Sequence, residues 1–314
     1  MKDRLSNVLD QEKFQQLSRN EIAEIVKEKR LPKCVAIMLD GTRRILKLEP
    51  EFRDDSWLYN EDHIKGLIYK SMQVADTFFD FGVDTVIGPL ASLGNLNRKN
   101  FMPEGLDRLF SPLTDEYSLD VIKKQKVGIS FYGDLDHARN LSGGEIIDKY
   151  SKILEKICPK NPQKRILLGI GFSTDTETDI IARLAVDYFN KNERVPNHDQ
   201  LVENYFGFQV PPIDIFIRTN EVKLSGGLTP LLTGPDTQLY FPVSPGIMSL
   251  TEPVLRKILY DYLFSRTLSH GTHEHSPISD SEAEEIKNFY IDHKNTVLGV
   301  GKKVGDIWIH KVDK

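Results

Sequence analysis

The sequence predicts an α/β protein with a central, mostly parallel sheet of about six strands flanked by helices, in one domain of residues 1–314. Short apolar runs alternate with amphipathic segments along the chain, which is typical of strands joined by crossover helices. Polar clusters follow these runs, at the strand ends where open α/β sheets bind ligands. With 39% apolar residues in 314, the chain can bury a sizeable core.

The elements follow in order from local patterns. Residues 1–31 place apolar side chains at helical spacing among charges, which predicts one or two amphipathic N-terminal helices. Strands are expected at 35–39, 84–90, 127–132, 165–171, 213–217 and 238–243. Helices are expected at 61–81, 104–125, 144–157, 176–190, 197–205, 251–265 and 280–293. The remaining pieces are loops at 45–60 and 266–280 and a glycine-punctuated hairpin at 297–310, so that residues 266–314 form a C-terminal loop, helix and hairpin.

The composition excludes several classes of function. A net charge of −5 and a pI of about 5.9 do not favour nucleic-acid binding. No apolar run approaches the ~18 residues of a membrane span, and the N-terminus lacks a signal-peptide core, so we expect a cytoplasmic protein. Cys34 adjoins an apolar strand, which favours a buried thiol. The irregular spacing of His270, His273 and His275 favours a solvated loop over a metal site.

The most informative stretch directly follows the first strand. It reads Asp40-Gly41-Thr42-Arg43-Arg44. Glycine lets the backbone approach a ligand closely, and arginine pairs suit phosphate oxygens. A neighbouring carboxylate suggests a divalent metal shared with those phosphates, although Asp40 could instead serve a turn or a helix cap. Several other strand ends are also polar, which together favours an anion site at one edge; they carry Ser92, Asn95, Gly133, Thr174 and Arg218.

These motifs, in this order, resemble those of the cis-prenyltransferases, the undecaprenyl diphosphate synthase superfamily. Residues 40–44 are similar to its Asp-Gly-Asn-x-Arg signature, and residues 62–66 to its Gly-His-x-x-Gly helix start. Residues 92–98 resemble its Ser-x-x-Asn-Trp-x-Arg segment without the Trp. Residues 214–225 resemble its Asp-x-x-Ile-Arg-Thr-x-x-Glu-x-Arg-x-Ser segment, one residue shorter and with Lys223 for the second Arg.

Part of the chain resembles one branch of that superfamily more narrowly. The Asp-Gly-Thr-Arg-Arg opening, residues 239–264 and the glycine-rich ending at 299–308 are similar to relatives that process a diterpenyl diphosphate instead of extending a chain. His63 and the retained Arg218 depart from that branch. Gln238 departs from the elongases, which have a metal-binding Glu at this position.

The resemblance implies a homodimeric, Mg²⁺-dependent enzyme with Asp40 as the metal ligand and Asp40, His63 and Asn95 as catalytic residues. It implies that the substrate diphosphate is bound by Gly41, Thr42, Arg43, Arg44, Arg53, Arg98, Arg218, Lys223 and Ser225. For four of these residues a purely structural role stays open as the alternative. His63 could start a helix, and Asn95 could form a turn. Arg53 could be a surface charge, and Arg218 could form a salt bridge. Asp134 is expected to be structural.

The leading hypothesis is a diterpene synthase or prenyl-group transferase. It would ionise an allylic, bicyclic C20 diphosphate and leave the cation to water or to an acceptor such as a nucleoside. Lys223 and Gln238 weaken the second diphosphate site that chain elongation needs, because lysine lacks the fork of arginine and a neutral amide binds Mg²⁺ poorly. A cis-prenyl chain elongase is the alternative, and a catalytically inactive binding subunit is a third possibility. The isoprenoid tail needs an apolar tunnel. The candidate lining residues, which ordinary core packing explains equally well, are Ile64, Leu67, Ile68, Phe78 and Leu90.

Overall fold

The chain divides into two compact units, Met1–Arg266 and Thr267–Lys314. The break falls where the sequence predicts the start of the C-terminal segment, and a single folding domain stays a prediction. The computed structural model describes residues 10–38, 48, 60–98, 103–141, 143–219, 221–227, 229–266, 278–305 and 307–311. The predicted loops at 45–60 and 266–280 therefore lie almost wholly outside the described residues.

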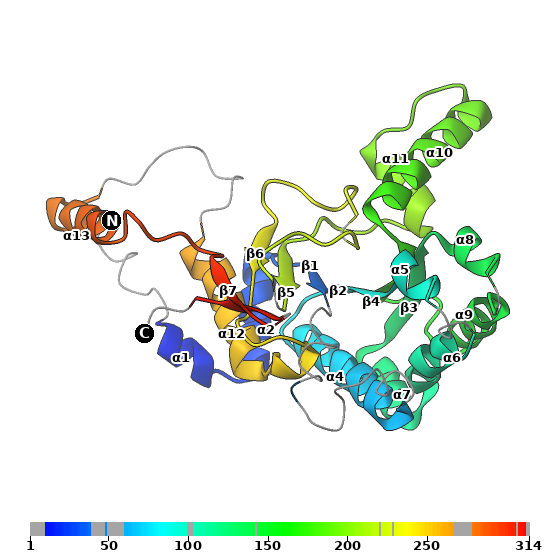
Figure 1. The fold of residues 1–314 in the computed structure, drawn as a ribbon, viewed down its shortest axis with the longest axis horizontal. Helices are drawn as coiled ribbons and strands as arrows, with labels where there is room; N and C mark the ends of the chain where they lie inside the picture. The colour runs from blue at the N-terminus through cyan, green and yellow to red at the C-terminus, as the bar shows by residue number, and fades with distance from the viewer. Residues whose placement is uncertain are drawn as a thin grey trace. The chain divides into compact units, whose positions relative to one another are not determined.

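The first unit is built on one six-stranded sheet (Figure 1). Its strands are β1 (Cys34–Met38), β2 (Thr85–Ser92), β3 (Val127–Gly133), β4 (Lys164–Phe172), β5 (Ile215–Arg218) and β6 (Gln238–Tyr240). The order is β3-β4-β2-β1-β5-β6, and every neighbouring pair is parallel. The six predicted strands and the predicted parallel sheet are confirmed.

Helices cover both faces of this sheet, which explains why all five residues of β1 are buried. On one face, Ala36 and Phe216 belong to a core with Val202 of α11 (His198–Phe206), and α10 (Thr174–Asn192) packs beside α11. On the other face, Ile37 and Val86 lie against α4 (Glu61–Asp80). In Figure 1, α10 and α11 lie on one side of the sheet and α4 on the other.

The other predicted helices are confirmed, with one exception. They are α9 (Glu145–Ile157), α12 (Glu252–Tyr260) and, in the second unit, α13 (Asp280–Asp292). The exception is the expected helix at 104–125, which is α6 (Glu104–Phe110), a 3-10 turn η3 (Ser111–Thr114) and α7 (Glu116–Gln125). Pro112 lies in the first positions of that turn, and proline cannot donate the backbone hydrogen bond that would continue α6.

The N-terminal segment forms two helices, α1 (Gln11–Gln16) and α2 (Arg19–Lys29). The second helix starts after Ser18 because this residue forms a capping box. The Ser18 Oγ accepts from the Glu21 N–H, and the Glu21 carboxylate accepts from the Ser18 N–H. Arg19 then pairs with Asp80 at 2.8 Å and with Glu252 at 2.7 Å, which fastens α2 to α4 and α12.

The second unit contains α13 and the predicted hairpin. The hairpin strands β7 (Gly301–Val304) and β8 (Ile307–His310) pair antiparallel, and Gly305 between them has a φ of 58°, which favours glycine. Among the described residues, no helix of either unit is long and apolar enough to cross a membrane.

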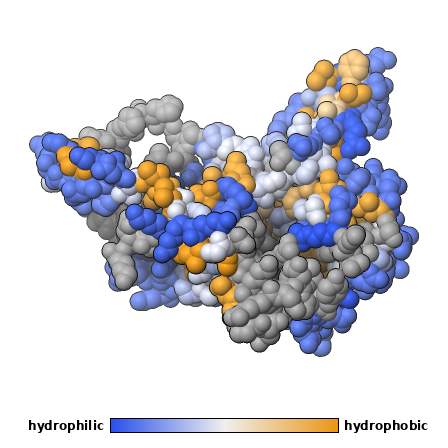
Figure 2. All heavy atoms as spheres, in the orientation of Figure 1, coloured by the Kyte–Doolittle hydropathy of each residue, from blue (hydrophilic) through white to orange (hydrophobic). Residues whose placement is uncertain are grey.

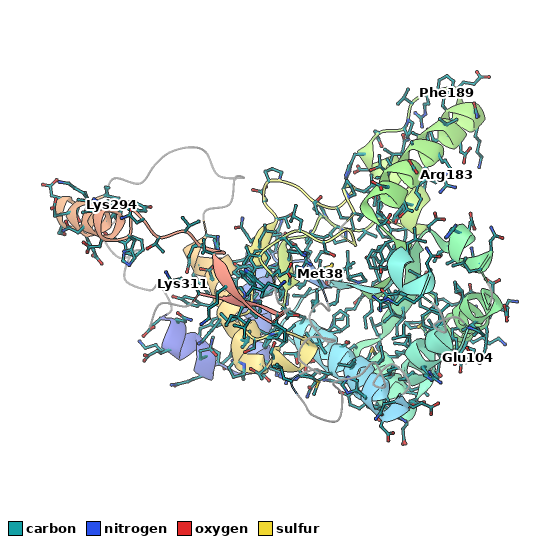
Figure 3. All side chains as sticks on the ribbon, viewed as in Figure 1. Met38, Glu104, Arg183, Phe189, Lys294 and Lys311 are labelled. Carbon is teal, nitrogen blue, oxygen red and sulfur yellow. The ribbon has the colours of Figure 1, made fainter. Side chains whose placement is uncertain are left out.

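Large apolar side chains are exposed on several parts of the described surface, and α10 and α13 are two of them. In the first unit, the outer end of α10 and the turn after it expose Val186, Phe189 and Val195, and apolar side chains are visible there in Figure 2. In the second unit, no described residue of α13 is buried. Phe189 points away from the sheet in Figure 3.

Candidate functional site

Three neighbouring strands bring the predicted site segments to one edge of the sheet. β1 lies between β2 and β5, and its last residue, Met38, is labelled in Figure 3. Met38 pairs with Arg218, the last residue of β5. β2 ends at Ser92. Because the strands are parallel, the segments that follow them begin at the same edge. The predictions for Asp40, Gly41, Thr42, Arg43, Arg44 and Arg53 lie outside the described residues.

The segment after β2 is held by a local hydrogen-bond exchange. Ser92 caps the short helix α5 (Leu93–Leu96): its Oγ accepts from the Asn95 N–H at 3.2 Å. Asn95 Oδ1 accepts in return from the Ser92 N–H at 3.0 Å and from its hydroxyl at 2.6 Å. Asn95 therefore has the turn role that the sequence left open, and a ligand contact would use its amide N–H group. Arg98 follows, half-buried, with its N–H donated to the Asn95 carbonyl at 3.2 Å.

The described residues after β5, which are 219, 221–227 and 229, are named here the post-β5 loop. Arg218 is only 5% exposed, and its Nη1 donates to the carbonyl oxygens of Lys223, at 2.9 Å, and of Leu224. The Lys223 ammonium forms an ion pair with Glu221, and Ser225 Oγ accepts from the Gly227 N–H at 3.3 Å. Arg218 thus fixes the loop that carries two other predicted diphosphate ligands.

The far end of the post-β5 loop returns to the ends of β2, β3 and β4. The Tyr132 hydroxyl of β3 donates to the Gly227 carbonyl at 3.2 Å. A Cβ at Gly227 would lie 2.7 Å from the Phe172 ring of β4 and 2.8 Å from Pro89 of β2, so only glycine fits. The loop therefore joins the carboxyl-end region of several strands, not β5 alone.

His63 lies in the first turn of α4. Its backbone N–H donates to the Oδ1 of the N-cap residue Asn60 at 3.0 Å. The backbone of His63 thus has the helix-start role that the sequence left open as an alternative. The half-buried imidazole has its pKa lowered by desolvation. A lowered pKa keeps the ring neutral near pH 7, which is the form that accepts a proton.

An apolar cavity lies between the sheet and α4. Its lining residues are Ile37, Ile68, Ser71, Met72, Ala75, Val86, Ile87, Gly88, Leu90, Leu113, Ile166, Leu168 and Ile247. The hydroxyl of Ser71 is satisfied, since it donates to the Leu67 carbonyl at 2.8 Å. Leu90 stands two residues before Ser92, so the wall of the cavity continues into the polar edge.

Two of the five tunnel candidates line this cavity, and three do not. Ile68 and Leu90 belong to its lining. Ile64 and Phe78 are buried as ordinary core side chains, and Leu67 is half-buried on α4. The structure therefore separates the residues that line the cavity from those that do not, and an isoprenoid tunnel stays a prediction.

Gln238 is placed at the beginning of β6, opposite Ile215, and not at the carboxyl end with Arg218. Its Nε2 donates to the Asp236 carbonyl at 3.2 Å. Within the described residues, no group of three or more His, Cys, Asp or Glu side chains is arranged to hold a metal ion. Asp134 has the expected structural role: it caps α8 (Leu135–Arg139) by accepting from the His137 N–H at 3.1 Å.

Sequence reasoning missed a buried polar group beside the post-β5 loop. Glu177 of α10 is 1% exposed, and its carboxylate accepts from the Tyr205 hydroxyl of α11. The available signal was its spacing, because Glu177 lies three residues before the buried Ile180 and so on the inward face of α10.

Comparison with known proteins gives two curated relatives, and no family model matches. Tuberculosinyl adenosine transferase of Mycobacterium tuberculosis (strain CDC 1551 / Oshkosh) is 28% identical over 306 residues, which are 96% of this chain and 98% of that protein. The (+)-kolavelool synthase of Herpetosiphon aurantiacus is 26% identical over 111 residues, 35% of this chain and 36% of that protein.

Solved structures share the fold. Lavandulyl diphosphate synthase from Lavandula x intermedia, in complex with dimethylallyl diphosphate, matches with a TM-score of 0.59 and 18% identity over 80% of this chain and 100% of that one. A probable undecaprenyl diphosphate synthase from Campylobacter jejuni matches with a TM-score of 0.53 and 19% identity, over 76% and 98%. The six-stranded parallel sheet flanked by helices is therefore the fold of cis-prenyltransferase-like proteins.

Proposed function

We propose that this chain, a cis-prenyltransferase-like protein by fold and by sequence, ionises an allylic diterpenyl diphosphate and releases diphosphate. The substrate would be a bicyclic C20 compound. The resulting cation would be captured by water or by an acceptor nucleophile such as a nucleoside. The names of the two curated relatives, a tuberculosinyl transferase and a kolavelool synthase, support the diterpene class.

The observation that carries the proposal is the junction of an apolar cavity with a polar strand edge. Leu90 lines the cavity, and Ser92 and Asn95 directly follow it at the end of β2. Arg218 ends β5 two strands away at the same edge. A prenyl diphosphate has the same division, with an apolar tail and an anionic head, so one molecule could occupy both parts.

Each polar residue has a proposed role at that edge. Arg98, Arg218 and Lys223, with Ser225 and the residues 41–44 and Arg53, would bind the diphosphate and stabilise its charge as it leaves. The Asn95 amide would donate to a leaving oxygen. The neutral imidazole of His63 would accept a proton from the attacking water or acceptor.

Mg²⁺ is proposed as the cofactor, with Asp40 as its protein ligand. Mg²⁺ is commonly held by one or two carboxylates while substrate phosphates and waters complete its shell, so a site with one carboxylate is sufficient. When bound, the ion would neutralise part of the diphosphate charge. The homodimer and the cytoplasmic location that the sequence led us to expect are also proposals.

Independence from isopentenyl diphosphate is proposed on the chemistry of Lys223. Its ammonium already pairs with Glu221, and a lysine offers a point charge where the elongases have the bidentate fork of arginine. A second diphosphate would have to compete for this charge both with Glu221 and with the substrate diphosphate that Lys223 is proposed to bind.

The proposal is tested by incubating the full chain and Mg²⁺ with C5 to C20 prenyl diphosphates and bicyclic C20 diphosphates, with and without isopentenyl diphosphate. Products are identified by mass spectrometry, with Asp40→Ala as the inactive control. We expect a C20 alcohol, or an adduct when a nucleoside is supplied, without isopentenyl diphosphate. Chain-lengthened products in comparable amounts would establish the elongase instead, and tight substrate binding without any product would indicate a binding subunit.

A further inference from the structure

The post-β5 loop is anchored at two ends, and its predicted diphosphate ligands lie between them. At the near end, Arg218 donates to the carbonyls of Lys223 and Leu224. At the far end, Tyr132 donates to the Gly227 carbonyl at 3.2 Å. Ser225 stands between these two anchors in the chain, so its position depends on both.

A buried carboxylate supports the far anchor. Glu177 is 1% exposed and accepts from the Tyr205 hydroxyl, which lies 2.7 Å and 2.8 Å from its two oxygens. The Tyr205 ring packs edge-on against the Tyr132 ring, with the ring centroids 6.3 Å apart. Tyr132 is the residue that donates to the Gly227 carbonyl, so Glu177 reaches the post-β5 loop through these two tyrosines.

The position of Glu177 links this anchor to the strand edge. α10 starts at Ser173, directly after β4, with a capping box between Ser173 and Thr176. Glu177 is therefore in the first turn of a helix that begins at the carboxyl end of β4. Because a carboxylate loses favourable hydration on burial, it is retained in such a place only where its hydrogen bonds compensate. Here the hydrogen bond from Tyr205 joins α11 to α10, and Tyr205 packs against Tyr132, which holds the post-β5 loop.

We propose that Glu177 is a positioning residue for diphosphate binding, which holds Tyr205 against Tyr132 and so fixes the far end of the post-β5 loop. The inference rests on the proposed function, because it assigns diphosphate binding to Lys223 and Ser225 of that loop. Glu177 itself does not contact substrate in this account. It affects diphosphate binding only by fixing the position of the post-β5 loop.

Two substitutions test this role, with one matched control. Glu177→Gln keeps the size of the side chain and removes its charge, and Tyr205→Phe removes only the hydroxyl that Glu177 accepts from. Tyr188→Phe is the control, because Tyr188 is also on α10 but its hydroxyl accepts from Arg194 at the surface. Hydrogen exchange of the amides in 221–227, calorimetric binding of inorganic diphosphate with Mg²⁺, and kcat and KM for the C20 diphosphate are measured for all three.

We expect Glu177→Gln and Tyr205→Phe to speed exchange in 221–227 and to weaken diphosphate binding and raise KM about tenfold, the effect of losing one strong hydrogen bond. kcat should change less than KM, and Tyr188→Phe should behave as wild type. Unchanged exchange in 221–227 in both variants would overturn the anchor. Faster exchange with unchanged diphosphate affinity would overturn the positioning role. If the wild type turns over no prenyl diphosphate, the proposed function fails, whereas the exchange measurement still decides whether Glu177 anchors the loop.

Discussion

At the scale of single residues, Arg218 combines a structural and a proposed binding task. It is almost fully buried and holds two carbonyls of the post-β5 loop, at the edge where the diphosphate is proposed to bind. Arg218→Ala should lower kcat/KM at least 100-fold, about 3 kcal/mol of lost charge stabilisation, and should also destabilise the fold by about 1–3 kcal/mol. Arg218→Lys should recover only part of the lost kcat/KM and of the lost stability, because lysine lacks the planar pair of N–H donors that arginine offers.

Steady-state kinetics and urea unfolding of the two Arg218 variants check this expectation. Arg183→Ala is the control, since Arg183 is an exposed arginine on α10. If both variants lose stability but keep the wild-type kcat/KM, Arg218 is a loop anchor without a role in the reaction.

Gly88 is predicted to set how much apolar tail the cavity accepts. It lines the cavity, and a Cβ at this position would meet nothing closer than the Ile37 carbonyl oxygen, at 3.8 Å. Gly88→Ala should therefore fold, narrow the cavity, and lower kcat/KM for a C20 diphosphate about tenfold while leaving the affinity for inorganic diphosphate unchanged. Gly66→Ala, at an exposed glycine of α4 with open space around it, is the matched control. Equal loss of C20 turnover and diphosphate affinity would speak against a tail site here.

The imidazole of His63 makes a pH-dependent prediction. Burial lowers its folded pKa below the usual ~6.5, so the neutral form is favoured in the native state. The native state then binds fewer protons than the unfolded one between these two pKa values, and the stability contributed by His63 is present above the unfolded pKa and lost as pH falls toward the folded one.

If His63 is the base, kcat should fall on the acid side with a midpoint below pH ~6.5. His63→Gln should lower kcat and remove this limb of the profile, as followed by diphosphate release between pH 5 and 8. A profile with the same acid limb in the variant would assign that titration to another group.

Single residues also mark what the sequence could and could not predict about the site. Ser92, Asn95 and Arg218 were predicted because strand ends in a parallel sheet share an edge, and this depends on local pattern alone. Glu177 was missed because its partner Tyr205 is 28 residues away in the chain, and a lone Glu in an amphipathic helix is usually solvated. Long-range hydrogen bonds leave no local pattern to read.

At the scale of elements, Asp214 joins the start of β1 to the helix that follows β6. Its carboxylate accepts from the N–H groups of Lys33, at 2.7 Å, and Cys34, at 3.0 Å, and from the Tyr262 hydroxyl at 3.1 Å. Asp214→Ala should cost about 3 kcal/mol or more of unfolding free energy, since it leaves these donors without an acceptor. Tyr262→Phe, which removes one of the three hydrogen bonds, should cost about 1 kcal/mol.

Urea unfolding with an unchanged m-value measures both changes. Burial raises the folded pKa of Asp214, so the native state binds more protons than the unfolded state around that pKa. Its contribution to stability is therefore greatest below the unfolded pKa and declines as pH rises through the folded one. If the two variants lose the same free energy of unfolding, the hydrogen bond from Tyr262 accounts for the whole contribution of Asp214 to stability.

Element boundaries were predictable where a local signal sets them. Strands and long helices followed from apolar spacing, and Ser18 and Ser92 capped α2 and α5 through their own neighbours. The break of 104–125 at Pro112 was readable from the proline, but the amphipathic pattern on both sides obscured it. The turn of π-helix at Asp261–Ser265 after α12 has no such local signal; Asp261 is held there by Tyr240 of β6 at 2.9 Å.

At the scale of the whole molecule, the proposed site combines one polar edge with one adjoining apolar cavity. The sheet order supplies the first, because β1 lies between β2 and β5, and α4 supplies the second by covering one face of the same strands. The order of strands in the sheet was not predicted from the sequence, since alternation of strands and helices fixes direction and not neighbours.

The most direct measurement of the central claim is calorimetric titration of the wild-type protein, in Mg²⁺, with inorganic diphosphate and with unreactive thiolo-diphosphate analogues of C5, C10 and C20 chain length. If the edge binds the head and the cavity binds the tail, affinity should rise with chain length, and the heat-capacity change should become more negative as more apolar surface is buried. A C20 analogue that binds no more tightly than inorganic diphosphate, with no added heat-capacity change, would contradict the account.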